Sequence, residues 1–358
     1  MKFSDIPGQR ETIGRLISTV KSERVSHAQL FTGPEGCGNL ALALTYARYV
    51  SCENRSDLDS CGTCKSCVKY EKMIHPDLHF VFPVVKKDTD PVSVKFIDKW
   101  RDFAAVSPYF SLTKWLNYIG AGNAQGLIFT SEAAEILRKL TLKSYESDFK
   151  VMIIWLPEKM HQVTANKLLK LIEEPPEKTL FLLVSDEPDK IVPTIISRCQ
   201  LVRIPSFTPS DISSYLIERF RIHKGRADDI ARVSNGNIIR AIELCENEDS
   251  SFQDLDRFRT LMRHVWKKDI LSLISWSEEL AAIGREPQKR FLSFSLHLFR
   301  ENLMMNLGQG KNGLVFLTGE EEAFSANFHP FVNEGNINTF VEEFSLAHSH
   351  IEANGNAK

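Results

Sequence analysis

A glycine-rich stretch has the residue types of a phosphate-binding loop. Residues 33–40 read G-P-E-G-C-G-N-L and follow the apolar run Ala28–Thr32. A working loop reads G-x-x-x-x-G-K-[ST]: backbone N–H groups bind phosphates, the lysine reaches the β- and γ-phosphates, and the hydroxyl binds magnesium. Gly33 and Gly38 keep this spacing, but Asn39 replaces the lysine and Leu40 replaces the hydroxyl residue. The loop can keep its turn, yet we expect it to bind neither ATP nor magnesium.

A second set of residues also indicates that ATP and magnesium are not bound. In ATPases of this architecture, a strand ends with an Asp that holds the magnesium shell and a Glu that polarises the attacking water. The apolar strand predicted at residues 151–155 ends instead with Trp155 and Leu156. Glu158 follows Pro157, too far along the chain to be a good substitute. The sequence therefore predicts that this ATPase site has lost its acidic residues as well as its lysine.

Four of the seven cysteines lie close together, at Cys52, Cys61, Cys64 and Cys67. Two nested C-x-x-C steps and one cysteine upstream provide four thiolates, the usual ligand set of a closed structural zinc site. An iron–sulfur cluster and reactive thiols are the alternatives, although the C-P continuation of a bacterial iron–sulfur motif is missing. A zinc ribbon that binds nucleic acid is a further alternative, and nearby lysines would serve it: Lys65, Lys69 and Lys72.

Composition sets broad limits on function. The chain has 358 residues, with 44 basic and 46 acidic side chains, which does not indicate a nucleic-acid polyelectrolyte. It has no apolar run long enough for a membrane span and no signal-peptide pattern at its start. We expect a cytoplasmic protein of two or three domains that does not enter membranes.

The elements that would position these residues alternate along the chain. Apolar runs predict strands at residues 28–32, 78–85, 151–155, 180–184 and 201–204, and helical patterns separate them. This order predicts a mostly parallel sheet covered on both faces. The aromatic segment 86–126 reads as an insertion that packs on this domain, with base stacking as the alternative. Beyond Pro205 the pattern is helical nearly to the end.

Several motifs, in this order and spacing, resemble the bacterial clamp-loader AAA+ family. The resemblance covers residues 3–205 closely and the helical remainder loosely. The segments that carry it are Gly8-Gln9, residues 27–31, the loop, the four cysteines, His75-Pro76-Asp77, residues 166–176 and Ser197-Arg198-Cys199.

The resemblance implies three domains. These are an α/β RecA-like AAA+ domain at 1–206 with a zinc module at 52–67, an all-α lid at 207–250, and an all-α collar for oligomerisation at 251–358. Within the lid, Gly236–Arg240 resembles a sensor-2 motif whose arginine is displaced by one position to Arg240.

The resemblance also implies a function. Gamma/tau subunits, a delta subunit and a member without ATP would form a five-membered ring that loads a sliding β clamp onto primed DNA. Arg198, with Ser197 and Cys199 beside it, would act in trans on a neighbour's ATP as an arginine finger. The expected metal is structural zinc, without ATP or magnesium. The alternatives are an active gamma/tau-like ATPase and the zinc-ribbon nucleic-acid binder.

Overall fold

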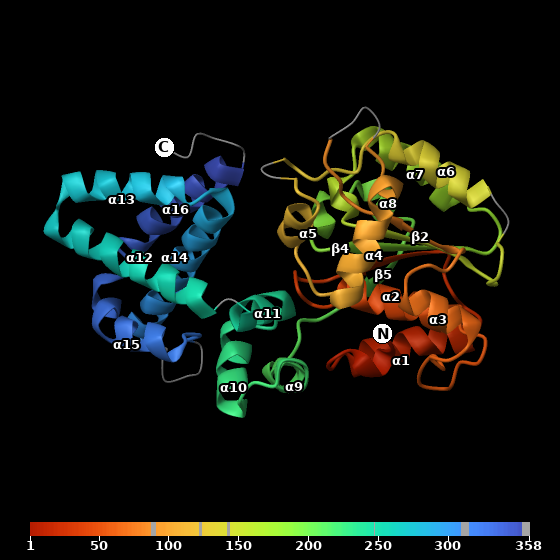
Figure 1. The fold of residues 1–358 in the computed structure, drawn as a ribbon, viewed down its shortest axis with the longest axis horizontal. Coiled ribbons are helices and arrows are strands. Elements are labelled where there is room, and N and C mark those ends of the chain that lie inside the picture. The colour runs from red at the N-terminus through yellow and green to blue at the C-terminus, as the bar shows by residue number, and fades with distance from the viewer. Residues whose placement is uncertain (87–90, 122–123, 142–143, 247, 309–314, 353–358) are drawn as a thin grey trace. The chain divides into compact units, whose positions relative to one another are not determined.

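The computed structural model describes the chain except for residues 87–90, 122–123, 142–143, 247, 309–314 and 353–358. It forms two compact units (Figure 1). The first comprises residues 1–215 and 236–240, and the second comprises 216–235 and 241–358. This division does not test the domain boundaries expected at 206 and 250, and those boundaries stay a prediction.

The first unit is built on a parallel sheet of five strands in the order β2-β3-β4-β1-β5. Each strand falls on one of the apolar runs, so the predicted parallel sheet is confirmed. β5 is an edge strand that pairs only with β1 among the described residues, and it is largely exposed. The strands are β1 (Ala28–Thr32), β2 (Leu78–Val81), β3 (Lys150–Trp155), β4 (Thr179–Ser185) and β5 (Gln200–Arg203).

Helices cover both faces of this sheet, because alternate residues of its buried strands point to opposite sides. On one face, Leu30, Ile154 and Leu183 pack with apolar residues of α6, α7 and α8. On the other face, α2 contacts β1, β3 and β4, and Figure 1 shows α2 and the α6–α7 pair on opposite sides. The bounds are η1 (Phe3–Asp5), α1 (Arg10–Lys21), α2 (Asn39–Val50), α3 (Lys65–Glu71), α6 (Glu132–Thr141), η3 (Pro157–Lys159), α7 (Gln162–Glu173), η4 (Pro188–Lys190) and α8 (Pro193–Ile196).

β2 is shorter than the sequence predicts: it ends at Val81 and does not continue to Val85. The reason is a change of hydrogen-bond partner. The N–H of Phe82 donates to Ser93 Oγ, which donates back to the carbonyl of Phe82, both at 3.0 Å. The residues that follow include Pro83, which lacks the N–H that a strand needs. The chain then enters the aromatic segment, which contains η2 (Ser93–Phe96), α4 (Ile97–Val106) and α5 (Leu112–Tyr118).

The described aromatic side chains of this segment are mostly core. Trp100 and Trp115 are fully buried, and both pack against Phe82. Tyr109 and Phe110 are also buried, whereas Tyr118 is exposed. The interpretation as a packed insertion is therefore confirmed for the buried rings, which are not available to stack on bases.

The second unit is helical, and its described apolar core draws on α12, α14, α15 and α16. Phe258, Phe291 and Phe299 are completely buried there, within the region where the sequence predicts helices. No helix in the described part of the chain is long and apolar enough to cross a membrane. From residue 209 onward the helices are α9 (Pro209–Phe220), α10 (Lys224–Val233), α11 (Ile238–Glu246), α12 (Glu248–Lys267), α13 (Ile270–Ala282), α14 (Arg285–Asn306), α15 (Gly319–Phe328), η6 (His329–Phe331) and α16 (Ile337–Glu352).

Candidate functional site

The glycine loop joins the end of β1 to the start of α2, as a phosphate-binding loop does. Gly36 and Gly38 have φ angles of 75° and 84°, in the left-handed region that glycine adopts without strain. The N–H of Cys37 donates to the carbonyl of Pro34 at 3.0 Å and closes the turn. Gly38 is the residue before α2, and its carbonyl accepts the first helical hydrogen bond, from Leu42. The backbone shape of the motif is therefore kept.

The chain's own residues pack closely around this loop. The N–H of Ile238 donates to the carbonyl of Gly36 at 3.1 Å. A Cβ added at Gly36 would lie 1.9 Å from Oδ1 of Asn237, and one added at Gly38 would lie 2.8 Å from the ring of Phe207. At the other end of the loop, Gly33 lies against the carbonyl of Ile204. At all three glycines, the space that a side chain would need is occupied by other residues of the same unit.

Asn39 occupies the position of the phosphate-binding lysine and is buried. Its amide nitrogen donates to Oδ1 of Asp186 at 2.7 Å and to the carbonyl of Ser185 at 3.3 Å. Burial raises the pKa of the Asp186 carboxyl, although the hydrogen bond from Asn39 opposes this shift. Asn39 therefore ties the start of α2 to the end of β4. Leu40, in place of the magnesium-binding hydroxyl, is buried too.

The end of β3 is also apolar and closed. Trp155 is buried, with its ring centroid 5.2 Å from that of Trp100 and 5.2 Å from that of Phe110. Leu156 is buried, and its N–H donates to the carbonyl of Val184 at 2.8 Å. Neither side chain can bind magnesium or polarise water.

Glu158, the remote substitute considered from the sequence, has a structural position. Its Oε1 accepts the N–H groups of Asp186 and Glu187 at 3.2 and 3.3 Å. Burial raises the pKa of this carboxyl. The carboxyl group of Glu158 thus fixes the backbone of the two residues that follow β4.

The four cysteines predicted as metal ligands come together. Their sulfur atoms all lie within 4.8 Å of one another, and those of Cys61 and Cys67 are 3.9 Å apart. Tetrahedral zinc with Zn–S bonds of about 2.3 Å spaces its sulfurs by roughly 3.8 Å, so this spacing fits the ion. The cysteines are free thiols, not disulfides. They form a cluster that could hold a metal ion.

Backbone N–H groups point at these sulfurs, as they do in many thiolate sites. Cys52 Sγ accepts the N–H of Cys61 at 3.3 Å, and Cys61 Sγ accepts that of Cys64 at 3.3 Å. Cys64 Sγ accepts the N–H of Cys67 at 3.4 Å. The N–H groups of Cys64 and Thr63 lower the pKa of the Cys61 thiol to about 6, which favours the thiolate that a metal binds.

Arg198 lies in an exposed turn between α8 and β5. Its Nη2 forms an ion pair with Glu173 at the end of α7, and its Nη1 donates to the carbonyl of Thr194 at 2.9 Å. Ser197 is exposed, and its hydroxyl donates to the same carbonyl. Cys199 packs against the core, where burial raises its thiol pKa to about 11. Cys199 therefore anchors the turn, and Arg198 presents a charge at the surface.

The protein comparisons address the family. A family model described as "DNA polymerase III, delta subunit" matches residues 8–208, more than half of the chain. The chain belongs to this family. The resemblance to bacterial clamp-loader subunits that the motifs carry is thereby confirmed.

Two curated relatives of this clamp-loader subunit are proteins of Bacillus subtilis (strain 168). DNA polymerase III subunit delta' is 31% identical over 234 residues, which are 65% of this chain and 58% of that protein. DNA polymerase III subunit tau is 24% identical over 346 residues, 90% of this chain and 54% of that protein. The chain thus spans little more than half the length of either relative.

A solved structure aligns over more of the chain. The gamma subunit-related protein of Thermotoga maritima aligns over 96% of this clamp-loader subunit and 100% of its own chain. The identity is 15% and the TM-score is 0.40, too low to add to the family assignment.

Three residues of this clamp-loader subunit that shape the candidate sites were not singled out from the sequence. Asn237 lies within the sensor-2-like segment, but its contact with Gly36 spans about 200 positions of chain, and no local pattern reports it. Glu173, the partner of Arg198, likewise comes from a distant helix. Arg48 could have been noticed from the sequence, because it is the single charged residue on the mostly apolar helix that leads to Cys52.

Proposed function

We propose that this clamp-loader subunit binds no ATP and acts as a delta-prime-type stator. In this role it joins gamma/tau and delta subunits in a five-membered ring that loads the sliding β clamp onto primed DNA. Arg198 contacts the ATP of a neighbouring gamma/tau subunit and completes that site. The family match and the resemblance to the delta' protein support this assignment.

The enclosure of the glycine loop carries the proposal. Phosphate binding requires open space above the loop and a cation beside it. Here Ile238 donates to the carbonyl of Gly36, Phe207 lies against Gly38, and the Asn39 amide is engaged with Asp186. A nucleotide would have to displace these contacts and would meet a buried carboxyl in place of a lysine. The loop therefore serves as a scaffold.

The surroundings of Arg198 support a role in trans. Its side chain is 38% exposed, in a turn anchored by Cys199, so a second chain can reach it. A guanidinium binds phosphate oxygens with two parallel hydrogen bonds. In the free subunit Glu173 holds the guanidinium, and the more highly charged γ-phosphate of a neighbour would replace that carboxylate.

We also infer that the cysteine cluster holds a structural zinc ion. All four ligand positions would be protein thiolates, so the ion would stabilise the 52–67 loop without activating water. We expect one zinc per chain by elemental analysis, and we expect its removal with a strong chelator to lower the melting temperature. Zinc-free protein with the same melting temperature would contradict this inference.

The second unit has exposed apolar residues that would suit contact with other subunits. Among the large apolar side chains exposed on it, Ile270, Leu271 and Ile274 lie within one turn at the start of α13, with 68%, 82% and 53% of their surface accessible. Trp266, just before this helix, is 73% exposed. Exposed apolar residues clustered in this way are typical of a protein interface. We propose that this part of the helical unit contacts the other subunits of the ring.

A gamma/tau-like ATPase is the competing function, because the alignment to the tau protein covers 90% of this chain. The two functions differ in a direct measurement on the isolated protein. We expect no saturable binding of ATP with magnesium by calorimetry. Tight magnesium-dependent binding would favour the ATPase and contradict the stator assignment.

The finger is tested in the reconstituted ring. Arg198→Ala is assembled with gamma/tau and delta subunits, and ATP hydrolysis and clamp loading on primed DNA are measured. Arg203→Ala is the matched control, because Arg203 is an exposed arginine on the adjoining edge strand. We expect loss of both activities for Arg198→Ala alone, whereas unchanged hydrolysis by a correctly assembled ring would contradict the finger.

The zinc-ribbon alternative predicts salt-sensitive DNA binding by the isolated chain through Lys65, Lys69 and Lys72. In the structure Lys69 already forms an ion pair with Glu146. We expect the triple substitution of these lysines to alanine to leave any DNA binding of the isolated chain unchanged.

A further inference from the structure

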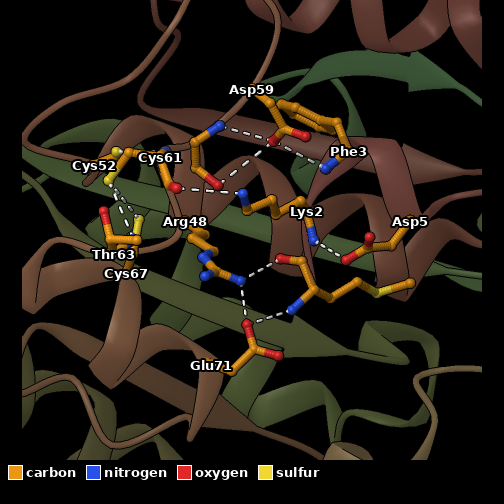
Figure 2. A network of polar contacts seen from close by, with 12 residues as sticks. Lys2, Phe3, Asp5, Arg48, Cys52, Asp59, Cys61, Thr63, Cys67 and Glu71 are labelled. Carbon is orange, nitrogen blue, oxygen red and sulfur yellow. Dashed lines mark hydrogen bonds and ion pairs between the residues drawn. The ribbon is translucent and has the colours of Figure 1, made fainter.

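A buried arginine lies next to the cysteine cluster. Arg48 belongs to the last turn of α2, four residues before Cys52, and its side chain is only 5% exposed. Its Nη1 donates to the carbonyl of Met1 at 2.7 Å and forms an ion pair with Glu71, the last residue of α3 (Figure 2). Arginine is rarely buried unless it has partners of opposite charge. One carboxylate that is itself half-exposed is a modest partner for such a burial.

The cysteine loop lies on the other side of the guanidinium: a Cβ added at Gly62, between Cys61 and Cys64, would lie 3.7 Å from Nη2 of Arg48. Burial acts to lower the pKa of Arg48, but the contacts with Cys67 and then Glu71 outweigh it and raise the pKa. The Nε–H of Arg48 is buried and has no hydrogen-bond partner in the part of the chain that the structure describes. A buried donor without a partner is therefore present beside the loop that carries Cys61 and Cys64.

Lys2 brings a second positive charge to the same place. Its Nζ donates to the carbonyl of Cys61 at 3.2 Å (Figure 2). Its Cε would lie 2.4 Å from a Cβ added at Gly62. Four thiolates around one zinc ion carry about two net negative charges. Half-buried in protein, such a charge is costly without compensation. The two cations lie where this compensation is needed, and only Arg48 is buried.

We propose that Arg48 belongs to the outer shell of the metal site, where its guanidinium compensates the thiolate charge and donates to the Cys67 sulfur, so that the metal is released slowly. This inference rests on the proposed zinc site. Outer-shell donors typically change metal affinity by about 10- to 100-fold. The competing explanation is that Arg48 only ties α2 to α3 and to Met1 through Glu71.

The test uses the full chain and measures zinc transfer to a chromogenic chelator after zinc content has been determined. We expect Arg48→Met to release zinc about 10- to 100-fold faster than the wild type. Glu71→Gln, which removes the ion pair but keeps the guanidinium, should stay near the wild-type rate. Arg55→Met is the matched control, because Arg55 is an exposed arginine near Cys52 whose Nη1 donates to the carbonyl of Val50.

A spectroscopic measurement separates the contact with sulfur from a purely structural role. In protein loaded with cobalt, the sulfur-to-cobalt charge-transfer band should shift in Arg48→Met and keep its position in Glu71→Gln and Arg55→Met. An unshifted band together with wild-type zinc release in Arg48→Met would overturn the inference. If Arg48→Met and Glu71→Gln accelerate zinc release equally, the inference would also be overturned, because loss of the Arg48–Glu71 ion pair would then be the cause.

Two further outcomes are distinguishable. If Arg48→Met does not fold, Arg48→Lys replaces it: an ammonium cannot hold Met1, Glu71 and Cys67 at once, so faster release is expected, and the wild-type rate would overturn the inference. If the wild-type protein binds neither zinc nor cobalt, the proposed zinc site fails, and this inference fails with it.

Discussion

The glycine loop follows β1 and the Ser197–Cys199 turn precedes β5, and the two regions differ in what surrounds them. Cys37, Asn39 and Leu40 of the loop are buried. In the turn, Ser197 and Arg198 are exposed, and only Cys199 packs against the core. The loop with the nucleotide-binding shape is thus packed against its own chain, whereas the arginine that we propose to bind phosphate is exposed. The difference is the basis of our proposal that the loop is a scaffold and that Arg198 acts on a neighbouring subunit.

The largest expected effect is on ATP hydrolysis by the ring, and it tests the role of the exposed Arg198. We expect Arg198→Lys in the reconstituted ring to lower single-turnover ATP hydrolysis at the neighbouring site by about 10³-fold or more, close to Arg198→Ala. Lysine keeps the charge but loses the planar fork that binds two phosphate oxygens. Arg203→Lys is the control. Activity of Arg198→Lys near the wild type would mean that a charge alone suffices.

The next largest effect is on the free energy of unfolding, and it tests the packing around the glycine loop. We expect Gly36→Ala to destabilise the chain by about 2–4 kcal/mol, because its φ is positive and Asn237 occupies the space of the methyl group. The measurement is urea unfolding. Gly14→Ala is the control, because Gly14 lies in α1 with nothing near its missing Cβ, and alanine there should stabilise by about 0.5–1 kcal/mol. Equal effects would show that the loop is not closed in solution.

A smaller effect concerns the carboxylate that holds Arg198. Glu173→Gln removes a partly exposed ion pair, which is worth about 1 kcal/mol at most. We expect the ATP concentration for half-maximal hydrolysis by the ring to fall by up to about 5-fold, since the guanidinium is released to the phosphate. A loss of activity like that of Arg198→Ala would instead show that Glu173 positions the arginine for catalysis.

The smallest effect is a pH dependence. Because burial raises the pKa of Asp186, the folded state favours its protonated form, so stability is lost as the pH rises through this pKa. Asp186→Asn keeps an acceptor for Asn39 and should flatten the decline in unfolding free energy that begins as the pH rises above the ordinary carboxyl pKa of about 4. Asp189→Asn, at an exposed carboxylate, should not change it. An unchanged slope in Asp186→Asn would show that Asn39 meets a normal carboxylate.

Local patterns predicted much of the fold. The five apolar runs became the five strands of the parallel sheet, and the helical pattern beyond Pro205 became the helices of the second unit. The prediction failed at the end of β2, where Ser93, eleven residues away, takes the hydrogen bonds of Phe82. Such a side-chain partner has no periodicity, so the pattern could not report it.

The sequence by itself determined which chemistry is missing, because the identities of Asn39, Leu40, Trp155 and Leu156 exclude the ligands that ATP and magnesium require. It also determined the cysteine cluster, since the spacing limits where the thiols can lie. Only the tertiary structure decided that Asn237 and Ile238 fill the loop and that Glu173 holds Arg198. These contacts join distant segments, and they exist only because the sheet and its helices bring those segments together.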